Sequence, residues 1–200
     1  MRTQVAITLA ANVGKMLTPE LAREIAREIC AAPDRSINPD QFPPVEYKGY
    51  TLAMERFSDI LPELHRLHER HYAEVTTSGI PMNPDYAAAK ADEYEGRLMQ
   101  FTARVKETDE LVANMRVYLC MSRHTQTLFA QEDTFYVVPE HRGGFMAVRL
   151  WQFTEKCVIQ AGAREITFDS KTMNNSDAMA RYLKYTPVSI KFSKTVHTEE

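Results

Sequence analysis

A glycine pair at the end of an apolar segment is the first feature of the sequence that could do chemistry. The run from Val137 to Gly144 reads Val-Val-Pro-Glu-His-Arg-Gly-Gly, and a strongly apolar segment follows it. A strand that ends in such a turn before a helix presents unpaired N–H groups and a positive helix end, which together bind phosphate. The guanidinium of Arg142 adds a positive charge with paired N–H donors that suit phosphate. A glycine turn that serves only the chain's conformation has the same residues, so the turn alone leaves both interpretations open.

Three histidines form a second pattern that could hold a ligand. His65, His68 and His71 recur at three-residue spacing, which can place imidazoles together on one side of a helix, as a metal site requires. Arginines and a glutamate stand between them, which is typical of a solvated helix face. We therefore predict a solvated face and no metal site.

The elements that position these residues begin with an N-terminal extension. Thr18-Pro19-Glu20 is a helix start, and apolar residues then recur at helical spacing, which predicts a helix over residues 18–32. Residues 32–45 hold four prolines and predict a linker or an extended arm. The chain thus divides near residue 45 into an extension, residues 1–45, and a main domain, residues 46–200.

The main domain alternates between strand and helix patterns. Tyr50, Leu52 and Met54 mark one face of a first strand, and Ser58 is the expected cap of the helix that follows. In the three segments 98–106, 111–122 and 125–138, apolar residues recur at every second position, which predicts three strands in an antiparallel meander. The remaining predictions are a helix over 84–97, a helix over 145–161, a strand over 164–169, a helix over 176–185 and a terminal strand over 188–193.

Composition excludes several classes of protein. With 200 residues, 44% hydrophobic and 26% charged, the chain fits one globular domain plus an extension. A net charge of -3 argues against binding to a phosphate backbone, so nucleic acid is not an expected partner. The three cysteines lie far apart in apolar sequence, which is typical of reduced thiols in the cytoplasm. No stretch is long enough to span a membrane.

The turn and the last helix together resemble the GNAT acetyltransferase superfamily. Its members carry Val-x-Pro-x-x-Arg-Gly-x-Gly-x-Gly/Ala after the fourth strand, and Asn-x-x-Ala-x-x-x-Tyr on the last helix. The family glycine three residues after the arginine falls on Phe145 here, and Thr186-Pro187 replaces the Gly-Phe that usually follows the tyrosine. The residues that match are Val137, Pro139, Arg142, Gly143 and Ala147 in the turn, and Asn175, Ala178 and Tyr182 on the helix.

The resemblance implies an α/β (α+β) fold: a mixed, mostly antiparallel sheet with helices on both faces and a splayed gap between the fourth and fifth strands. It also implies direct transfer from acetyl-CoA to an amine, in which Tyr182 protonates the departing thiolate. The general base is Asp133 by counting back from Pro139, or Glu132 if the strand carries a bulge. The implied contacts with acetyl-CoA are Phe135, Val137, Val138, Arg142, Gly143, Gly144, Phe145, Met146, Ala147 and Asn175.

Two functions follow from this resemblance. One is an N-acyltransferase, whose acceptor is a primary amine on a small molecule or a protein. Acidic residues on the first two helices of the main domain, such as Glu74 and Asp92, suit a cationic amine. The other is a non-catalytic GNAT-fold protein, acting in binding or assembly, in which Phe145 fills the pyrophosphate site. The candidate catalytic residues also have purely structural interpretations. Tyr182 is then a packed core residue, and Glu132 and Asp133 are solvent-facing residues of the strand. A homodimer through the terminal strand is compatible with either function.

Overall fold

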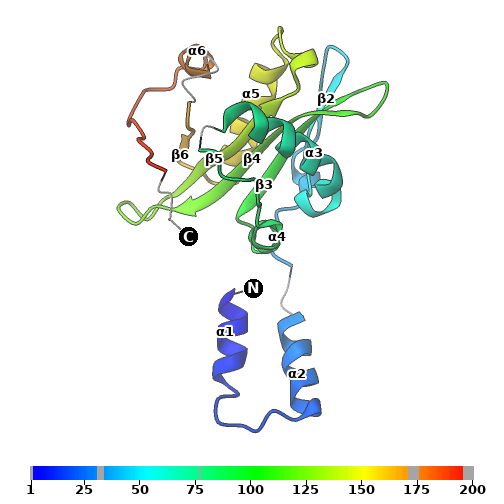
Figure 1. Ribbon diagram of the computed structural model, residues 1–200, viewed down its shortest axis with the longest axis vertical. Helices are drawn as coiled ribbons and strands as arrows, with labels where there is room; N and C mark the ends of the chain where they lie inside the picture. Colours follow the sequence, from blue (N-terminus) through cyan, green and yellow to red (C-terminus); the bar gives the residue numbers. More distant parts are fainter. Residues whose placement is uncertain (1, 31–33, 77, 171–175, 196–200) are drawn as a thin grey trace.

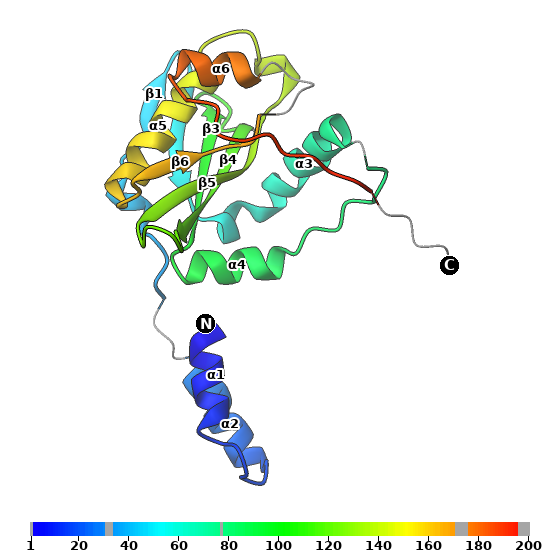
Figure 2. The ribbon, with the colours of Figure 1, turned by 90° about the vertical axis from the view of Figure 1, so that its left-hand side faces the viewer.

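The computed structural model describes residues 2–30, 34–76, 78–170 and 176–195 of the chain. Its first two helices, α1 (Arg2–Ala10) and α2 (Pro19–Cys30), pack as a hairpin that projects away from the remaining elements (Figures 1 and 2). The predicted N-terminal helix is confirmed as α2, whereas the sequence pattern did not predict α1. Within the described residues, no helix combines the length and the apolar character needed to cross a membrane.

A six-stranded sheet forms the body, and its strands lie side by side in chain order (Figure 1). The first five pair in antiparallel fashion, and the sixth pairs with the fifth in the parallel direction. The predicted meander is confirmed, and one short strand that the sequence did not predict precedes it. The strands are β1 (Val45–Tyr47), β2 (Tyr50–Glu55), β3 (Leu98–Val105), β4 (Leu111–Met121), β5 (Leu128–Val137) and β6 (Glu165–Thr167).

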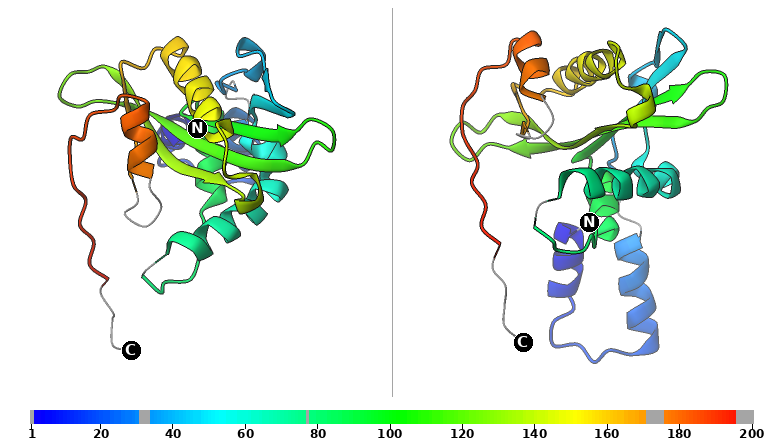
Figure 3. Two further views of the ribbon diagram at one scale, coloured as in Figure 1. Left: turned by 90° about the horizontal axis from the view of Figure 1, so that it is seen from above. Right: turned by 45° about the horizontal axis from the view of Figure 1, so that its top comes forward.

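Helices cover both faces of the sheet, as the resemblance implies. One face carries α5 (Met146–Gln160) and α6 (Ser176–Tyr182), and the other carries α3 (Phe57–Val75) and α4 (Tyr86–Tyr94) (Figures 2 and 3). Trp151 of α5 is 1% exposed and packs edge-on against Phe135 of β5. The apolar face of each long helix is therefore what fixes it on the sheet.

The segment before the sheet packs against the body. A short 3-10 helix, Pro39–Gln41, leads to Phe42, which is buried in the core. The Arg35 N–H donates a hydrogen bond to the Tyr94 carbonyl at the end of α4. Residues 34–44 thus form an arm against the main domain, although they precede its expected boundary at residue 45.

The start of α3 is capped differently from the sequence-based expectation. The helix begins at Phe57, so the prediction that Ser58 caps it is wrong. The carboxylate of Glu93, a buried residue of α4, instead accepts hydrogen bonds from the N–H groups of Phe57 and Ser58. A carboxylate at a helix N-terminus satisfies two unpaired donors and interacts favourably with the helix dipole. A partner 35 residues away in the sequence could not be read from local capping rules.

The predicted terminal strand, residues 188–193, is wrong. The described residues 186–195 run without a strand partner, and three apolar side chains of this segment point into solvent. Alternating apolar residues form a strand only where a neighbouring strand offers hydrogen bonds and a surface to pack on. Of the strands that the structure describes, β6 forms this edge of the sheet; it has three residues, and no further described strand pairs with it. The exposed fractions are 78% for Val188, 81% for Ile190 and 89% for Phe192.

Candidate active site

The gap in the sheet lies between β5 and β6. These strands pair only from Phe129 to Gln131 on β5, opposite Glu165 to Thr167 on β6. Strand β5 then continues to Val137 in pairing with β4 alone. All three residues of β6 are paired, so no described strand pairs with β5 on this side after Gln131. Strands β5 and β6 correspond to the fourth and fifth predicted strands, and the gap that the resemblance implies between them begins there.

The glycine turn follows at the far end of β5. The 3-10 helix Pro139–His141 leads to Gly143, whose φ of 107° lies in the region that favours glycine. A Cβ built on Gly143 or Gly144 meets no atom within 4 Å, so the backbone is open on that side. No side chain caps α5 at Phe145, and the first amide to join the helical ladder there is that of Arg149. The amides of the first turn of α5 are therefore available to an anion.

A pocket of about 210 Å³ lies in the splay. Its apolar part is an aromatic group from three elements, in which Trp151 contacts both Phe135 and Phe168 edge-on, with ring centroids 5.2 and 4.6 Å apart. Its polar part combines carboxylates with one imidazole and one amine. The polar lining residues are His71, Gln131, Glu132, Asp133, Asp169 and Lys191.

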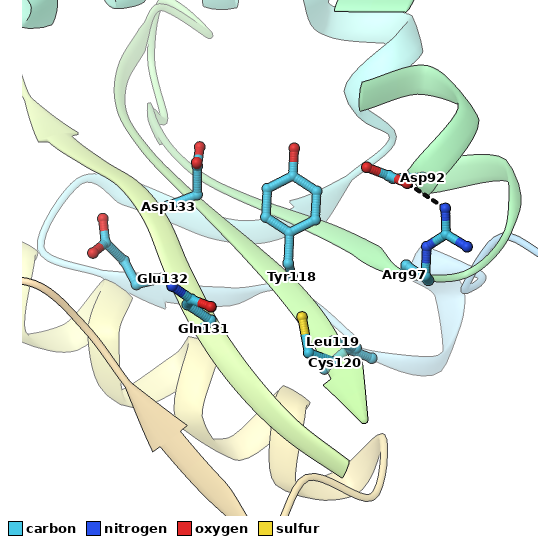
Figure 4. A pocket seen from close by; sticks show the side chains of 8 residues that line it. All are labelled: Asp92, Arg97, Tyr118, Leu119, Cys120, Gln131, Glu132 and Asp133. Carbon is cyan, nitrogen blue, oxygen red and sulfur yellow. Dashed lines mark hydrogen bonds and ion pairs between the residues drawn. The ribbon is translucent and has the colours of Figure 1, made fainter. Parts of the chain in front are cut away.

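A second pocket, of about 350 Å³, lies beside the first between α4, β4 and β5 (Figure 4). It shares Gln131, Glu132 and Asp133 with the splay pocket, so this part of β5 borders both. Asp92 and Arg97 form an ion pair at its α4 side. Tyr118 faces it from β4, and burial raises the pKa of this tyrosine above its usual range. Three carboxylates and one guanidinium line this pocket.

Comparison with known proteins identifies the fold. No protein-family model and no curated protein sequence matches the chain. An aminoglycoside acetyltransferase from an uncultured soil metagenomic sample, in complex with sisomicin, is 14% identical, with a TM-score of 0.60 over 74% of this chain and 97% of that one. A GNAT family acetyltransferase of Staphylococcus aureus is 14% identical, with a TM-score of 0.53 over 74% of this chain and 100% of that one. The chain has the GNAT fold.

A further solved structure agrees with this result. The ribosomal-protein-alanine N-acetyltransferase of Brucella melitensis biovar Abortus 2308 is 20% identical, with a TM-score of 0.57, and the match covers 76% of this chain and 100% of that one. The similarity extends over nearly the whole of each of these structures. Because identity stays at or below 20% in all three, it establishes the fold alone.

The GNAT turn accommodates a phenylalanine at the position of the family glycine. Phe145 has a φ of -91° and a ψ of 7°, so its backbone needs no glycine, and Gly143 supplies the positive φ. The Phe145 side chain is 54% exposed and its ring lies 6.0 Å from that of Tyr182, so it leans toward α6 and does not fill the turn. The open backbone and the uncapped helix fit a pyrophosphate group.

Arg142, the guanidinium of the turn, is already engaged by other groups of the protein. Its Nε donates to the Val137 carbonyl at 2.7 Å, and its terminal nitrogens hold both carboxylate oxygens of Glu74 at 2.7 and 2.9 Å. The guanidinium also holds the pKa of Glu74 below its usual range. Arg142 thus fastens the turn to the end of α3, and a pyrophosphate would share its charge with Glu74.

Within the GNAT sheet, a bulge separates the roles of the two predicted carboxylates. The register of β4 and β5 shifts so that Glu132 lies opposite Val117 and Thr134 opposite Arg116, which leaves Asp133 as the extra residue. Oδ2 of Asp133 accepts hydrogen bonds from Arg116 at 2.6 and 2.9 Å and from the Thr134 hydroxyl at 2.9 Å. Three donors on one oxygen hold Asp133 as an ion-paired carboxylate on the α3 side of the strand.

The predicted tyrosine lies on the rim of the site. Tyr182 ends α6 and is 59% exposed, while Met179, three residues earlier on the same helix, lines the splay pocket. Residues three apart share a helix face, so α6 connects the pocket at Met179 with the turn at Tyr182. The neighbouring Tyr185 is bonded to Trp151 and Glu155, and burial raises its pKa. Asn175 lies outside the described residues.

The histidines are the main residues that sequence patterns placed wrongly. His68 is 7% exposed, so the prediction of a solvated face is wrong for it. Its Nδ1 and that of His65 both lie 3.0 Å from the Tyr86 hydroxyl, and burial lowers the pKa of His68 to about 4. His71 stacks on Tyr136 and lines the splay pocket. Over the described residues, no three histidine, cysteine or acidic side chains form a metal-binding group.

Proposed function

We propose that the chain is an N-acyltransferase that moves an acetyl group from acetyl-CoA to a primary amine by direct attack. The observation that carries the proposal is the separation of β5 from β6 after Gln131, which opens a pocket on the path to the glycine turn. The amides from Gly143 to Ala147 hold the pyrophosphate, and the aromatic group around Trp151 contacts the acyl end. Phe135, Val137 and Val138 supply backbone along the arm between them.

The proposed general base is Glu132. Its partner across the sheet, Val117, lies two residues from Met115, the partner of Phe135, which packs on Trp151 of α5. Glu132 therefore lies on the α5 side of the sheet, whereas Asp133 is bound to Arg116 on the other side. Glu132 takes the proton from the ammonium, a β5 amide polarises the thioester carbonyl, and Tyr182 protonates the thiolate as it leaves.

The proposed acceptor site is the pocket between α4, β4 and β5. It meets the splay pocket at Gln131 to Asp133, so an amine held there can reach the thioester past Glu132. The carboxylates of Asp92, Glu132 and Asp133 line this pocket, and although two of them pair with Arg97 and Arg116, their oxygens favour an ammonium group over an anion. Two of the structural neighbours are named for amine acceptors, an aminoglycoside and the alanine of a ribosomal protein.

Calorimetric titration with acetyl-CoA, followed by thiol release over a panel of amines, tests this proposal. We expect saturable binding and amine-dependent release of coenzyme A. Gly144→Asp places a carboxylate in the open space of the turn and weakens binding by at least about tenfold, since one such charge contact is worth about 1.4 kcal/mol. Gly144→Asn is the matched control of equal size without charge, and it retains most of the affinity. Absence of binding at millimolar acetyl-CoA refutes the enzymatic role.

The rival function, a non-catalytic GNAT-fold module, is favoured by one observation. The guanidinium of Arg142 is bound to Glu74 and to the Val137 carbonyl, so the turn lacks an unengaged cation. Glu74→Gln removes the competing charge. If this variant alone binds acetyl-CoA, the native turn is closed to the ligand and the non-catalytic function is correct.

A further inference from the structure

The last described segment of the chain crosses the open side of the splay. After α6, residues 186–195 run back past β5 and β6 in the direction of α3 (Figure 2). Lys191 pairs with Asp169, which follows β6, and lines the splay pocket. The segment thus contacts the site at one charged side chain.

The orientation of this segment is opposite to what its composition favours. Successive side chains of an extended chain point to opposite sides, so Lys191 faces the pocket while its neighbours Ile190 and Phe192 face solvent. Burying either apolar neighbour would be favourable, yet it is Lys191, whose side chain is itself 70% exposed, that lines the pocket. The pairing with Asp169 determines which side faces the pocket.

The surroundings of Lys191 are those that an acceptor amine requires. Glu132 and Asp133 line the same pocket, beside the aromatic group where the acyl end of acetyl-CoA is expected. Among the described residues that line either pocket, Lys191 carries the only primary amine. A group tethered in this way has an effective concentration of roughly millimolar without binding from solution.

We propose that Lys191 is itself an acyl acceptor, so that the chain acylates its own C-terminal segment at this residue. The inference rests on the proposed acyltransferase function. The ammonium first loses one proton to a pocket carboxylate, and the carboxylate passes this proton to solvent. Its Nζ attacks the thioester carbonyl, the N–C bond forms and the C–S bond breaks. A second nitrogen proton goes to the thiolate, which leaves a neutral amide on Lys191 and free coenzyme A.

Acylation changes the contact that holds the segment at the site. The amide has no positive charge, so the ion pair with Asp169 is lost. The segment is then held at the pocket by neither a charge nor a buried apolar side chain. Acylation of Lys191 therefore releases the segment and uncovers the splay for external amines.

The test incubates the purified full chain with acetyl-CoA and no amine, and follows acetylation by intact mass and peptide mapping. We expect one acetyl group per chain, at Lys191, with a rate constant that does not change on tenfold dilution of the protein. Lys191→Arg keeps the cation but abolishes the modification. Lys194→Arg, three residues further on the same segment, is the matched control and leaves it unchanged.

Three outcomes overturn the inference: label spread over exposed lysines, label that persists in Lys191→Arg, or a rate that rises with protein concentration. Calorimetry and amine-dependent thiol release are measured on the same preparation. If acetyl-CoA binds and external amines are acetylated while Lys191 stays unmodified, self-acylation alone is wrong. If neither binding nor turnover occurs, the proposed acyltransferase function is wrong and the inference falls with it.

Discussion

Single substitutions of the two neighbouring carboxylates on β5, Glu132 and Asp133, distinguish the proposed general base from a carboxylate with a structural role. Glu132→Gln keeps the shape of the side chain and removes its basicity. A positioned general base contributes about 100- to 10,000-fold, or about 2.7–5.5 kcal/mol of transition-state free energy, and we expect kcat/KM to fall in that range. Affinity for acetyl-CoA stays unchanged, since Glu132 acts on the amine.

Asp133→Asn is expected to lower stability and to leave kcat/KM nearly unchanged. Its carboxylate pairs with Arg116, and the side chains of the two residues are 41% and 14% exposed. A charged hydrogen bond discounted for this exposure contributes about 1 kcal/mol to the free energy of unfolding, and we expect a loss of that size with kcat/KM altered only a few-fold. Steady-state kinetics and urea unfolding of both variants decide between them. If Asp133→Asn loses activity at least 100-fold while Glu132→Gln stays near wild type, our assignment from the bulge is wrong.

Three further variants test the chemistry and the frame of the site. His68 has a pKa of about 4 in the folded protein and 6.5 in the unfolded chain, so between these pH values the unfolded state binds the extra proton. The free energy of unfolding therefore falls by about 3 kcal/mol as the pH drops from 6.5 to 4. His68→Gln flattens this pH dependence, measured by urea unfolding. Tyr182→Phe lowers kcat about 100-fold in thiol-release kinetics and leaves acetyl-CoA affinity unchanged, because the hydroxyl acts only as the thiolate departs. Glu93→Gln removes the charge at the start of α3 and lowers the unfolding free energy by about 1–2 kcal/mol, measured by denaturation.

Each of these has a matched control and a result that contradicts it. His124→Gln, at an exposed turn, leaves the pH dependence intact, and an equal flattening would mean that His68 is not its origin. Tyr185→Phe loses hydrogen bonds to Trp151 and Glu155 and so lowers stability; if it lowers kcat as Tyr182→Phe does, the acid is misassigned. Asp59→Asn, exposed in the same helical turn, costs at most about 0.5 kcal/mol, and a loss as large as that of Glu93→Gln contradicts specific capping.

The sequence predicted elements whose signals are local. The meander, α5 and the turn at Gly143 follow from alternation, helical spacing and the need for a positive φ, all within a few residues of chain. The same rules predicted a strand over 188–193, because alternation describes the side chains and says nothing about a hydrogen-bonding neighbour. The sheet offers none there, so the pattern is present without the strand.

The site was less predictable because its residues meet only through the fold. His71 and Lys191 are 120 positions apart, and no spacing rule connects an imidazole on α3 with an amine after α6, yet both line the splay pocket. The burial of His68 depends in the same way on Tyr86 from the neighbouring helix. One signal was available in the sequence, since three histidines on a helix with apolar residues at Leu64 and Leu67 already place some of them next to the core.

The bulge and the splay are two consequences of one local event in β5. Pairing with β6 ends at Gln131, and the extra residue, Asp133, enters the pairing with β4 two positions later. A bulge bends its strand and increases the local twist, which turns the second half of β5 away from the direction of its first half, where β6 pairs with it. Ordinary alternation places Glu132 and Asp133 on different sides of the strand, and the bulge breaks this alternation between Asp133 and Thr134, which both contact Arg116. A single inserted residue therefore bends the strand beside the pocket and holds Asp133 on Arg116, while Glu132 lies on the opposite side of the strand.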